Sequence, residues 1–239
     1  MFRFSEIIAG QPRSGKTFRA CQTAKKYLAA RRGGVMVYNN FNLNDFEGAT
    51  TLVLLADKKE IRTPLGNKKI IDCLYFRDKK GKYIEFNYYN ICAEHGAFFF
   101  IKITKIANKN LYLNTILSIK NTLHIIDDAS NIYDNGRTNE ATTTILSSLT
   151  HYQIDILFLF HNVNIVPPRF YNYATHVTLF KTKVKCDTKK MELVEIVDII
   201  DDAVDYLNSP KTKQFSSITI INDENHSKQK ETVVIINKV

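Results

Sequence analysis

The chain has 239 residues, 44% of them hydrophobic and 24% charged, which is typical of a globular protein with one sizeable core. The longest apolar run, residues 154–160, contains Asp155 and is too short to cross a membrane, and the first motif begins too early to leave space for a signal peptide. The formal net charge of +9 favours a polyanionic partner, nucleic acid first, although a basic surface without such a partner would have the same charge.

The first 40 residues predict a strand, a helix and a second strand. Residues 2–10 alternate in polarity and then run apolar into Gly10, as a strand does when it enters a tight loop. Helical spacing from Lys16 to Arg32 is followed by Gly33 and Gly34, which predict a glycine C-cap, and residues 35–40 form a continuous apolar strand. This strand–helix–strand unit implies a parallel sheet.

The next part of the chain predicts a β-rich insertion at about residues 51–107. Its strand-like segments are residues 51–57, 68–76, 82–89 and 97–106. Residues 77–83, "RDKKGKY", have the composition of a hairpin turn between two of them. Antiparallel hairpins within an α/β chain are typical of an insertion or of a sheet edge.

The remaining elements return to the α/β pattern. We expect helices at residues 110–122 and 139–152, strands at 123–128 and 155–162, further strands with a basic turn over 174–199, and two short β-runs in a polar tail after Ser209. The predicted organisation is a P-loop domain over residues 1–208 and a C-terminal extension over 209–239. The fold class is α/β, a mainly parallel sheet flanked by helices.

A phosphate-binding motif lies between the first strand and the first helix. The sequence GQPRSGKT matches G-x-x-x-x-G-K-[ST], and its predicted nucleotide-binding residues, with the adjoining phenylalanine, are Gly10, Gln11, Pro12, Arg13, Ser14, Gly15, Lys16, Thr17 and Phe18. The glycines allow backbone N–H groups to surround a phosphate, Lys16 would lie along the β- and γ-phosphates, and the Thr17 hydroxyl would be a Mg²⁺ ligand. The alternative is a chance glycine turn, which the strand before it and the helix after it disfavour.

Two acids and a polar pair end two later strands. Asp127 and Asp128 follow the strand "LHII", and in a P-loop protein the first acid holds Mg²⁺ while the second polarises the attacking water. The alternative is a helix cap in which Asp128 or Ser130 is the N-cap. His161, followed by Asn162, could contact the γ-phosphate, or these residues could simply form a turn at the end of the strand.

In this order of motifs, with "NVNIVPPRF" after the polar pair, the chain resembles the FtsK–HerA branch of the additional-strand P-loop ATPases. It is most similar to the genome-packaging ATPases of tailless viruses, and the Zot-like phage assembly ATPases share the pattern. The resemblance spans about residues 4–183. It implies a sensor strand between the two Walker strands, Mg²⁺ and ATP as cofactors, and a homo-oligomer, usually a hexameric ring, whose ATP sites an arginine of the neighbour completes.

The chain departs from this family in three places. Asp128 stands where a glutamate is usual, and His161 stands where many members have a glutamine, so the protonation of that imidazole would matter. Many members have an arginine before the sensor strand, and this chain has none there, so the candidate arginine finger is Arg137, with Arg169 as second choice. Either arginine could instead be exposed to solvent or contact phosphate.

These features predict a Mg²⁺-dependent ATPase that moves DNA, with Lys16, Asp128, His161 and Arg137 as catalytic residues and Thr17 and Asp127 as metal ligands. Two basic turns, residues 77–82 and 181–190, would neutralise DNA phosphates without reading bases, or are solvated loops. The resemblance implies genome packaging in the host cytoplasm, with capsid or portal-vertex proteins as partners and association with the virion. The alternatives are a Zot-like assembly ATPase, a P-loop small-molecule kinase and a non-hydrolysing nucleotide-gated adaptor. The acid pair argues against the adaptor.

Overall fold

The computed structural model describes residues 4–38, 46–64, 66–131, 153–192, 194, 196–223 and 231–237. Within them one sheet of 11 strands has the order β11-β10-β9-β1-β8-β7-β2-β6-β3-β4-β5. Its central strands are parallel, and antiparallel strands extend it at both ends. The predicted fold class, with a β-rich insertion and a β-containing tail, is confirmed.

The strands are β1 (Ser5–Ala9), β2 (Gly34–Tyr38), β3 (Thr50–Arg62), β4 (Lys68–Arg77), β5 (Tyr83–Glu85), β6 (Phe100–Ile106), β7 (Thr122–Ile126), β8 (Ile154–Phe160), β9 (His176–Phe180), β10 (Ser217–Asp223) and β11 (Glu231–Asn237). The α-helices are α1 (Lys16–Ala29), α2 (Tyr88–His95), α3 (Lys109–Ile116), α5 (Pro168–Tyr173) and α6 (Val197–Asn208). The short 3₁₀ turns η2 (Ala129–Asn131) and η4 (Val163–Ile165) follow β7 and β8.

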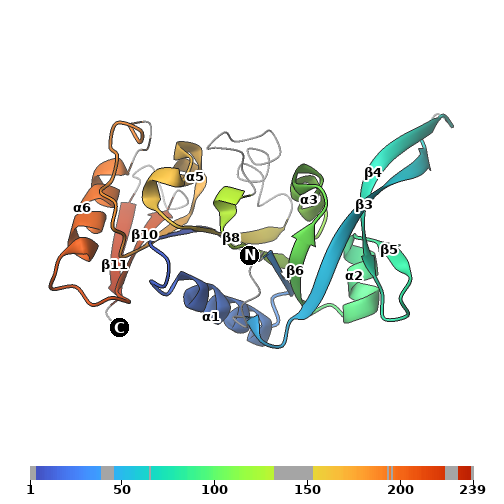
Figure 1. Ribbon diagram of the computed structural model, residues 1–239, viewed down its shortest axis with the longest axis horizontal. Helices are drawn as coiled ribbons and strands as arrows, with labels where there is room; N and C mark the ends of the chain where they lie inside the picture. Colours follow the sequence, from blue (N-terminus) through green and yellow to red (C-terminus); the bar gives the residue numbers. More distant parts are fainter. Residues whose placement is uncertain are drawn as a thin grey trace.

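Helices cover both faces of the sheet, with α1 on one side and α3 and α5 on the other (Figure 1). Successive residues of each central strand therefore enter different cores, because side chains alternate across a strand. Ile8 packs with the core under α1, whereas its neighbour Ile7 belongs to the core on the opposite face. Burial on both faces explains why these strands are almost continuously apolar.

The order of the central strands places the functional segments together. Strand β8 lies between β1 and β7, with parallel pairing on both sides. The carboxyl ends of these strands therefore meet at one edge of the sheet, where ligands bind in open α/β sheets. This position of β8 is the one that the family resemblance implied.

Strands β3 and β4 form a long antiparallel arm that projects from one end of the molecule (Figure 1). The turn predicted at residues 77–83 is confirmed, since Arg77 and Tyr83 pair across β4 and β5. At the opposite end, β10 pairs with β9 and carries β11, so the C-terminal strands continue the central sheet. The division of the chain after residue 208 stays a prediction.

Several predicted elements were wrong in extent or type. Helix α1 ends at Ala29 with Ala30 as its C-cap, so the predicted glycine cap does not form, and Gly34 already belongs to β2. The strand expected at residues 82–89 stops at Glu85, because the Asn87 side chain accepts a hydrogen bond from the Asn90 N–H (3.0 Å) and starts helix α2.

We predicted strands over residues 174–199, but the part of this segment after β9 does not form strands. Residues 181–192 are turns, bends and irregular chain, and helix α6 begins at Val197. Its buried residues Ile200, Ala203, Val204 and Leu207 have helical spacing, which outweighs the strand preference of the β-branched residues before them. Helix α3 is shorter than predicted and ends at Ile116, whereas the helix predicted at 139–152 lies outside the described residues.

Candidate nucleotide site

The phosphate loop, residues 10–17, connects β1 to α1 and needs glycine at both glycine positions of the motif. A Cβ on Gly10 would lie 2.7 Å from Cβ of Phe180 and 3.2 Å from that residue's backbone carbonyl carbon. Gly15, the residue before α1, has φ 105°, a left-handed conformation that side chains strongly disfavour. The close approach of β9 and the turn into the helix therefore explain both glycines.

The loop presents donors and a buried cation to its ligand. The first N–H groups of α1 have no intrahelical acceptor, and the helix N-terminus carries partial positive charge. The Nζ atom of Lys16 is buried and donates to the backbone oxygens of Gly10 (2.7 Å) and Gln11 (2.8 Å). Within the described residues, the buried Ser14 Oγ has no hydrogen-bond partner. These groups are suited to an anionic ligand.

The electrostatics of Lys16 are unusual for a lysine. Burial lowers its pKa to about 8, and the nearby carboxylates of Asp127 and Asp128 act in the opposite direction. The lysine on the phosphate loop and the acids after β7 are thus close enough to interact, as expected for a nucleotide site. Phosphate oxygens would favour the charged ammonium form further.

The two acids occupy different environments. The backbone N–H of Asp127 donates to the Tyr38 oxygen at the end of β2 (2.9 Å), and burial raises the pKa of the Asp127 carboxyl. The pKa of Asp128 is lowered, first by a hydrogen bond from His161 and also by one from Ser130. Paired carboxyls with opposite shifts are typical of sites where the two groups have separate tasks.

Asp128 is held by side chains from two elements. Its Oδ1 accepts from Ser130 Oγ at 2.6 Å and lies 3.4 Å from Nε2 of His161, and its Oδ2 accepts from the side chain of Asn131. Ser130 and Asn131 belong to η2, so Asp128 does stabilise the turn that follows it. The same carboxylate also faces the end of β8, which a residue that only capped the turn would not need to do.

His161 and Asn162, the polar pair after β8, make different contacts. His161 points to Asp128, and its side chain is 41% exposed. The Asn162 side chain instead accepts from the Asn164 N–H (2.7 Å) and starts η4. The strand-end turn is therefore made by Asn162, which leaves His161 facing the site.

The predicted metal ligands have oxygen chemistry that suits Mg²⁺. Thr17 is partly exposed at the start of α1, and Asp127 is buried at the end of β7. Over the described residues, no three His, Cys, Asp or Glu side chains gather as a complete metal site. A P-loop Mg²⁺ uses a hydroxyl, phosphate oxygens and water in addition to carboxylate, so Thr17 and Asp127 fit such a site.

The remaining predicted residues are the two candidate arginines and the lysines of the basic turns. Arg137 is outside the described residues, and Arg169 is exposed on α5. The segment after β9 exposes Lys183, Lys185 and Lys189. This exposure agrees with contact to DNA phosphates and also with a solvated loop. In the part of the chain that the structure describes, no helix is long and apolar enough to span a bilayer.

An ion pair between a half-buried arginine and a buried carboxylate lies behind the loop and was not predicted from the sequence. Arg19 of α1 contacts the buried Glu6 of β1 through Nε (3.0 Å) and Nη2 (2.9 Å). Thr178 of β9 donates to the same carboxylate (2.7 Å) and also contacts the hydroxyl of Thr219 on β10 (2.9 Å). The signal in the sequence was a glutamate next to the two isoleucines of the first strand.

The strand order, with the glycine loop after β1 and the acids after β7, is that of the P-loop NTPase fold. No family model matches the chain, and no curated protein matches its sequence significantly. Solved structures do match its fold. The genome-packaging NTPase B204 of Sulfolobus turreted icosahedral virus 2, in complex with ATPγS, has a TM-score of 0.65 at 12% identity, over 99% of this chain and 97% of B204.

VirB4 of Thermoanaerobacter pseudethanolicus is similar over 98% of this chain and 89% of its own, with a TM-score of 0.54 and 10% identity. The N-terminal domain of the zonular occludens toxin of Neisseria meningitidis has a TM-score of only 0.42 at 10% identity. The similarity to B204 and VirB4 confirms the predicted P-loop NTPase fold.

Proposed function

We propose that this chain is a Mg²⁺-dependent ATPase whose hydrolysis cycle moves DNA, and that the DNA is a viral genome entering its capsid. The observation that carries the proposal is the convergence of Lys16, Asp127, Asp128 and His161 at the carboxyl ends of three adjacent strands. The fold similarity to B204, a genome-packaging NTPase solved with AMPPCP, ATPγS and AMP, supports the choice of nucleotide and of process.

Each residue has a role in this proposal. The loop amides and Lys16 bind the phosphates, and Thr17 and Asp127 hold Mg²⁺, which would offset negative charge on the phosphates. Asp128 orients and polarises the attacking water. Its low pKa keeps it ionised near neutrality, so it acts through a negative charge and an acceptor oxygen. His161, bonded to Asp128, can report the presence of the γ-phosphate to that acid.

The DNA-moving part of the proposal rests on charge and on assembly. Exposed lysines on the turns after β9 and the basic turn between β4 and β5 can neutralise phosphates without sequence preference. We further propose a homo-oligomeric ring, hexameric by resemblance, in which Arg137 of one subunit completes the site of the next. Capsid or portal-vertex proteins would anchor the ring, which places the protein in the host cytoplasm and at the virion.

Steady-state ATP hydrolysis tests the enzymatic core of this proposal. Lys16→Ala should abolish turnover, because the phosphates lose their buried counterion. Lys25→Ala, an exposed lysine on the same helix, is the matched control and should hydrolyse ATP like the parent. Equal turnover by the parent and Lys16→Ala would contradict the site. Movement is tested separately, by ATP-dependent displacement of a third strand annealed to duplex DNA.

A further inference from the structure

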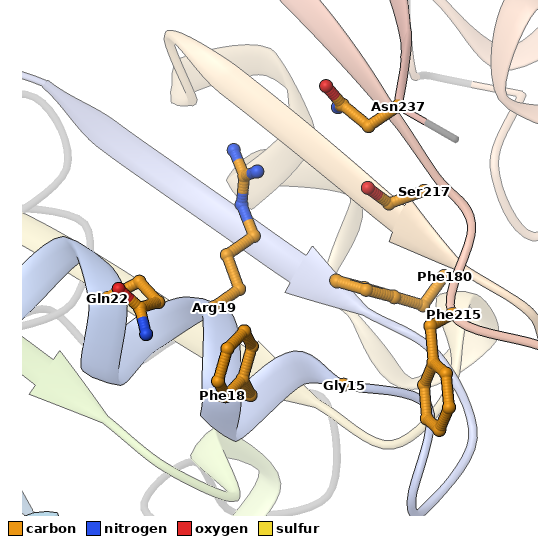
Figure 2. A pocket seen from close by; sticks show the side chains of 8 residues that line it. All are labelled: Gly15, Phe18, Arg19, Gln22, Phe180, Phe215, Ser217 and Asn237. Carbon is orange, nitrogen blue, oxygen red and sulfur yellow. The ribbon is translucent and has the colours of Figure 1, made fainter. Parts of the chain in front are cut away.

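A cavity of about 560 Å³ opens beside the phosphate loop, next to Gly15 (Figure 2). Most of its wall is apolar and is formed by Phe18, Phe180 and Phe215. A volume of this size is within the range of sites that bind small molecules. None of the phosphate-binding chemistry described above uses this cavity.

The three phenylalanines come from three separate elements. Phe18 lies in the first turn of α1, Phe180 is the last residue of β9, and Phe215 precedes β10. Phe180 is buried, whereas Phe18 is 70% exposed and Phe215 is 50% exposed. The cavity therefore has a fixed aromatic base and two aromatic rings whose faces remain accessible.

These rings lie directly against the phosphate loop. A Cβ placed on Gly15 would be 3.3 Å from Cε1 of Phe180 and 3.7 Å from Cδ1 of Phe215. Figure 2 shows Phe18 and Phe215 on opposite sides of Gly15, with Phe180 between them and the sheet. A ligand whose phosphates rest on the loop amides would thus have its remaining part beside this aromatic wall.

Few polar groups line the cavity. Arg19 contributes to its wall, but its Nε and Nη2 atoms are both directed to the Glu6 carboxylate. The other polar lining residues are Gln22, Ser217 and Asn237. A flat, aromatic ligand group that binds mainly by stacking is the best match for such a wall.

We propose that this cavity is the nucleobase subsite of the chain, in which the base of the bound nucleotide stacks on Phe18 and Phe215. The C-terminal strand pair supplies one wall of that subsite, since Phe215, Ser217 and Asn237 all belong to it or precede it. The inference rests on the proposed nucleotide function and adds the residues that distinguish a nucleotide from inorganic phosphate.

Binding of ATP and of inorganic tripolyphosphate to the full chain tests this proposal. Phe215→Ala should weaken ATP binding roughly five- to hundredfold and leave tripolyphosphate binding unchanged. Phe18→Ala should do the same, and Phe215→Tyr, which keeps the ring, should restore ATP affinity. Phe98→Ala is the matched control, because Phe98 is 52% exposed and lies before β6, outside the cavity.

The outcomes separate the two proposals. ATP affinity that stays at the parent value in both Phe215→Ala and Phe18→Ala would overturn the subsite while leaving the phosphate site intact. Weakened binding of tripolyphosphate as well as ATP would also overturn it, since the variants would then have damaged the loop. A parent chain that binds neither ligand would instead refute the nucleotide function itself.

Discussion

Replacing Gly10 with alanine should damage the phosphate site more than it damages the fold. The added Cβ would lie 2.7 Å from Cβ and 3.2 Å from the carbonyl carbon of Phe180, and 3.1 Å from Oγ of Ser14. The first two atoms are close to or part of the backbone of β9, so they cannot rotate away. The loop must therefore move relative to β9.

The size of the effect follows from two contacts. Overpacking of this kind costs about 1–3 kcal/mol, which lowers the melting temperature of a chain of this size by roughly 2–12 °C. The Gly10 oxygen also accepts from Lys16 Nζ (2.7 Å), so a shifted Gly10 moves the acceptor that positions this ammonium. Loss of one charge-assisted bond at this point should weaken ATP binding roughly 10- to 100-fold.

Gly96→Ala is the matched control for this experiment. Gly96 has φ 82° and ψ 171°, a region that is open essentially to glycine alone, so alanine there costs about 1–3 kcal/mol of backbone strain, but its Cβ would meet nothing within 4 Å. Thermal unfolding and ATP titration of both variants should show similar losses of stability and a loss of affinity in Gly10→Ala alone. Unchanged ATP affinity in Gly10→Ala would refute the claim that this loop packs against β9 in order to bind phosphate.

Three further predictions concern the acids, a buried histidine and the assembly. In ATP-binding and turnover assays, Asp128→Asn should retain ATP and Mg²⁺ but lose hydrolysis, whereas Asp127→Asn should shift the Mg²⁺ dependence itself; parent-like behaviour of both would leave the acids only a turn-forming role. His124 in β7 is fully buried, and burial lowers its pKa to about 4. Between pH 4 and about 6.5 the unfolded chain therefore binds more protons than the folded chain. The free energy of unfolding should fall by up to about 3 kcal/mol as the pH drops through that range. Chemical denaturation of His124→Leu should lack this loss, and an equally acid-sensitive variant would refute the assignment. Arg137→Ala should bind ATP normally but turn it over about 10³- to 10⁵-fold more slowly, and mixing it with Lys16→Ala should restore activity; no rescue at any ratio would exclude a finger acting between subunits.

The parts of the fold that sequence predicts best are those fixed by local chemistry. The strand before Gly10, the loop and the start of α1 follow from glycine positions, a single lysine and helical spacing, all within one short segment. The acid pair was found because it directly follows a buried strand. His161 was placed in the same way, and its contact with Asp128 follows from the order of parallel strands.

Features that depend on distant segments were beyond sequence reasoning. The Glu6–Arg19 pair joins a strand to a helix, and its third partner, Thr178, is 172 residues from Glu6 in the sequence. Phe215 reaches Gly15 only because β10 pairs with β9 at the edge of the central sheet. The contact of Phe215 with Gly15 leaves no periodic or compositional signal, and Glu6 alone does not reveal its partners.

Local propensity gave wrong predictions where helix caps or tertiary burial decided the secondary structure. Asn87 starts a helix inside a segment whose tyrosines and isoleucine favour a strand. Helix α6 follows β-branched residues, yet the burial of Ile200 and Val204 against the sheet selects the helix. Such conflicts are resolved by packing that the sequence does not reveal.

The most direct test of the central claim is the rate of ATP hydrolysis by the purified chain with and without double-stranded DNA. A DNA-moving ATPase should hydrolyse ATP faster when DNA is added, in proportion to DNA length up to saturation, and Lys16→Ala should remain inactive under both conditions. Heparin, a polyanion without a duplex, serves as the control for charge alone. Turnover that DNA does not change, or that heparin stimulates equally, would contradict the account.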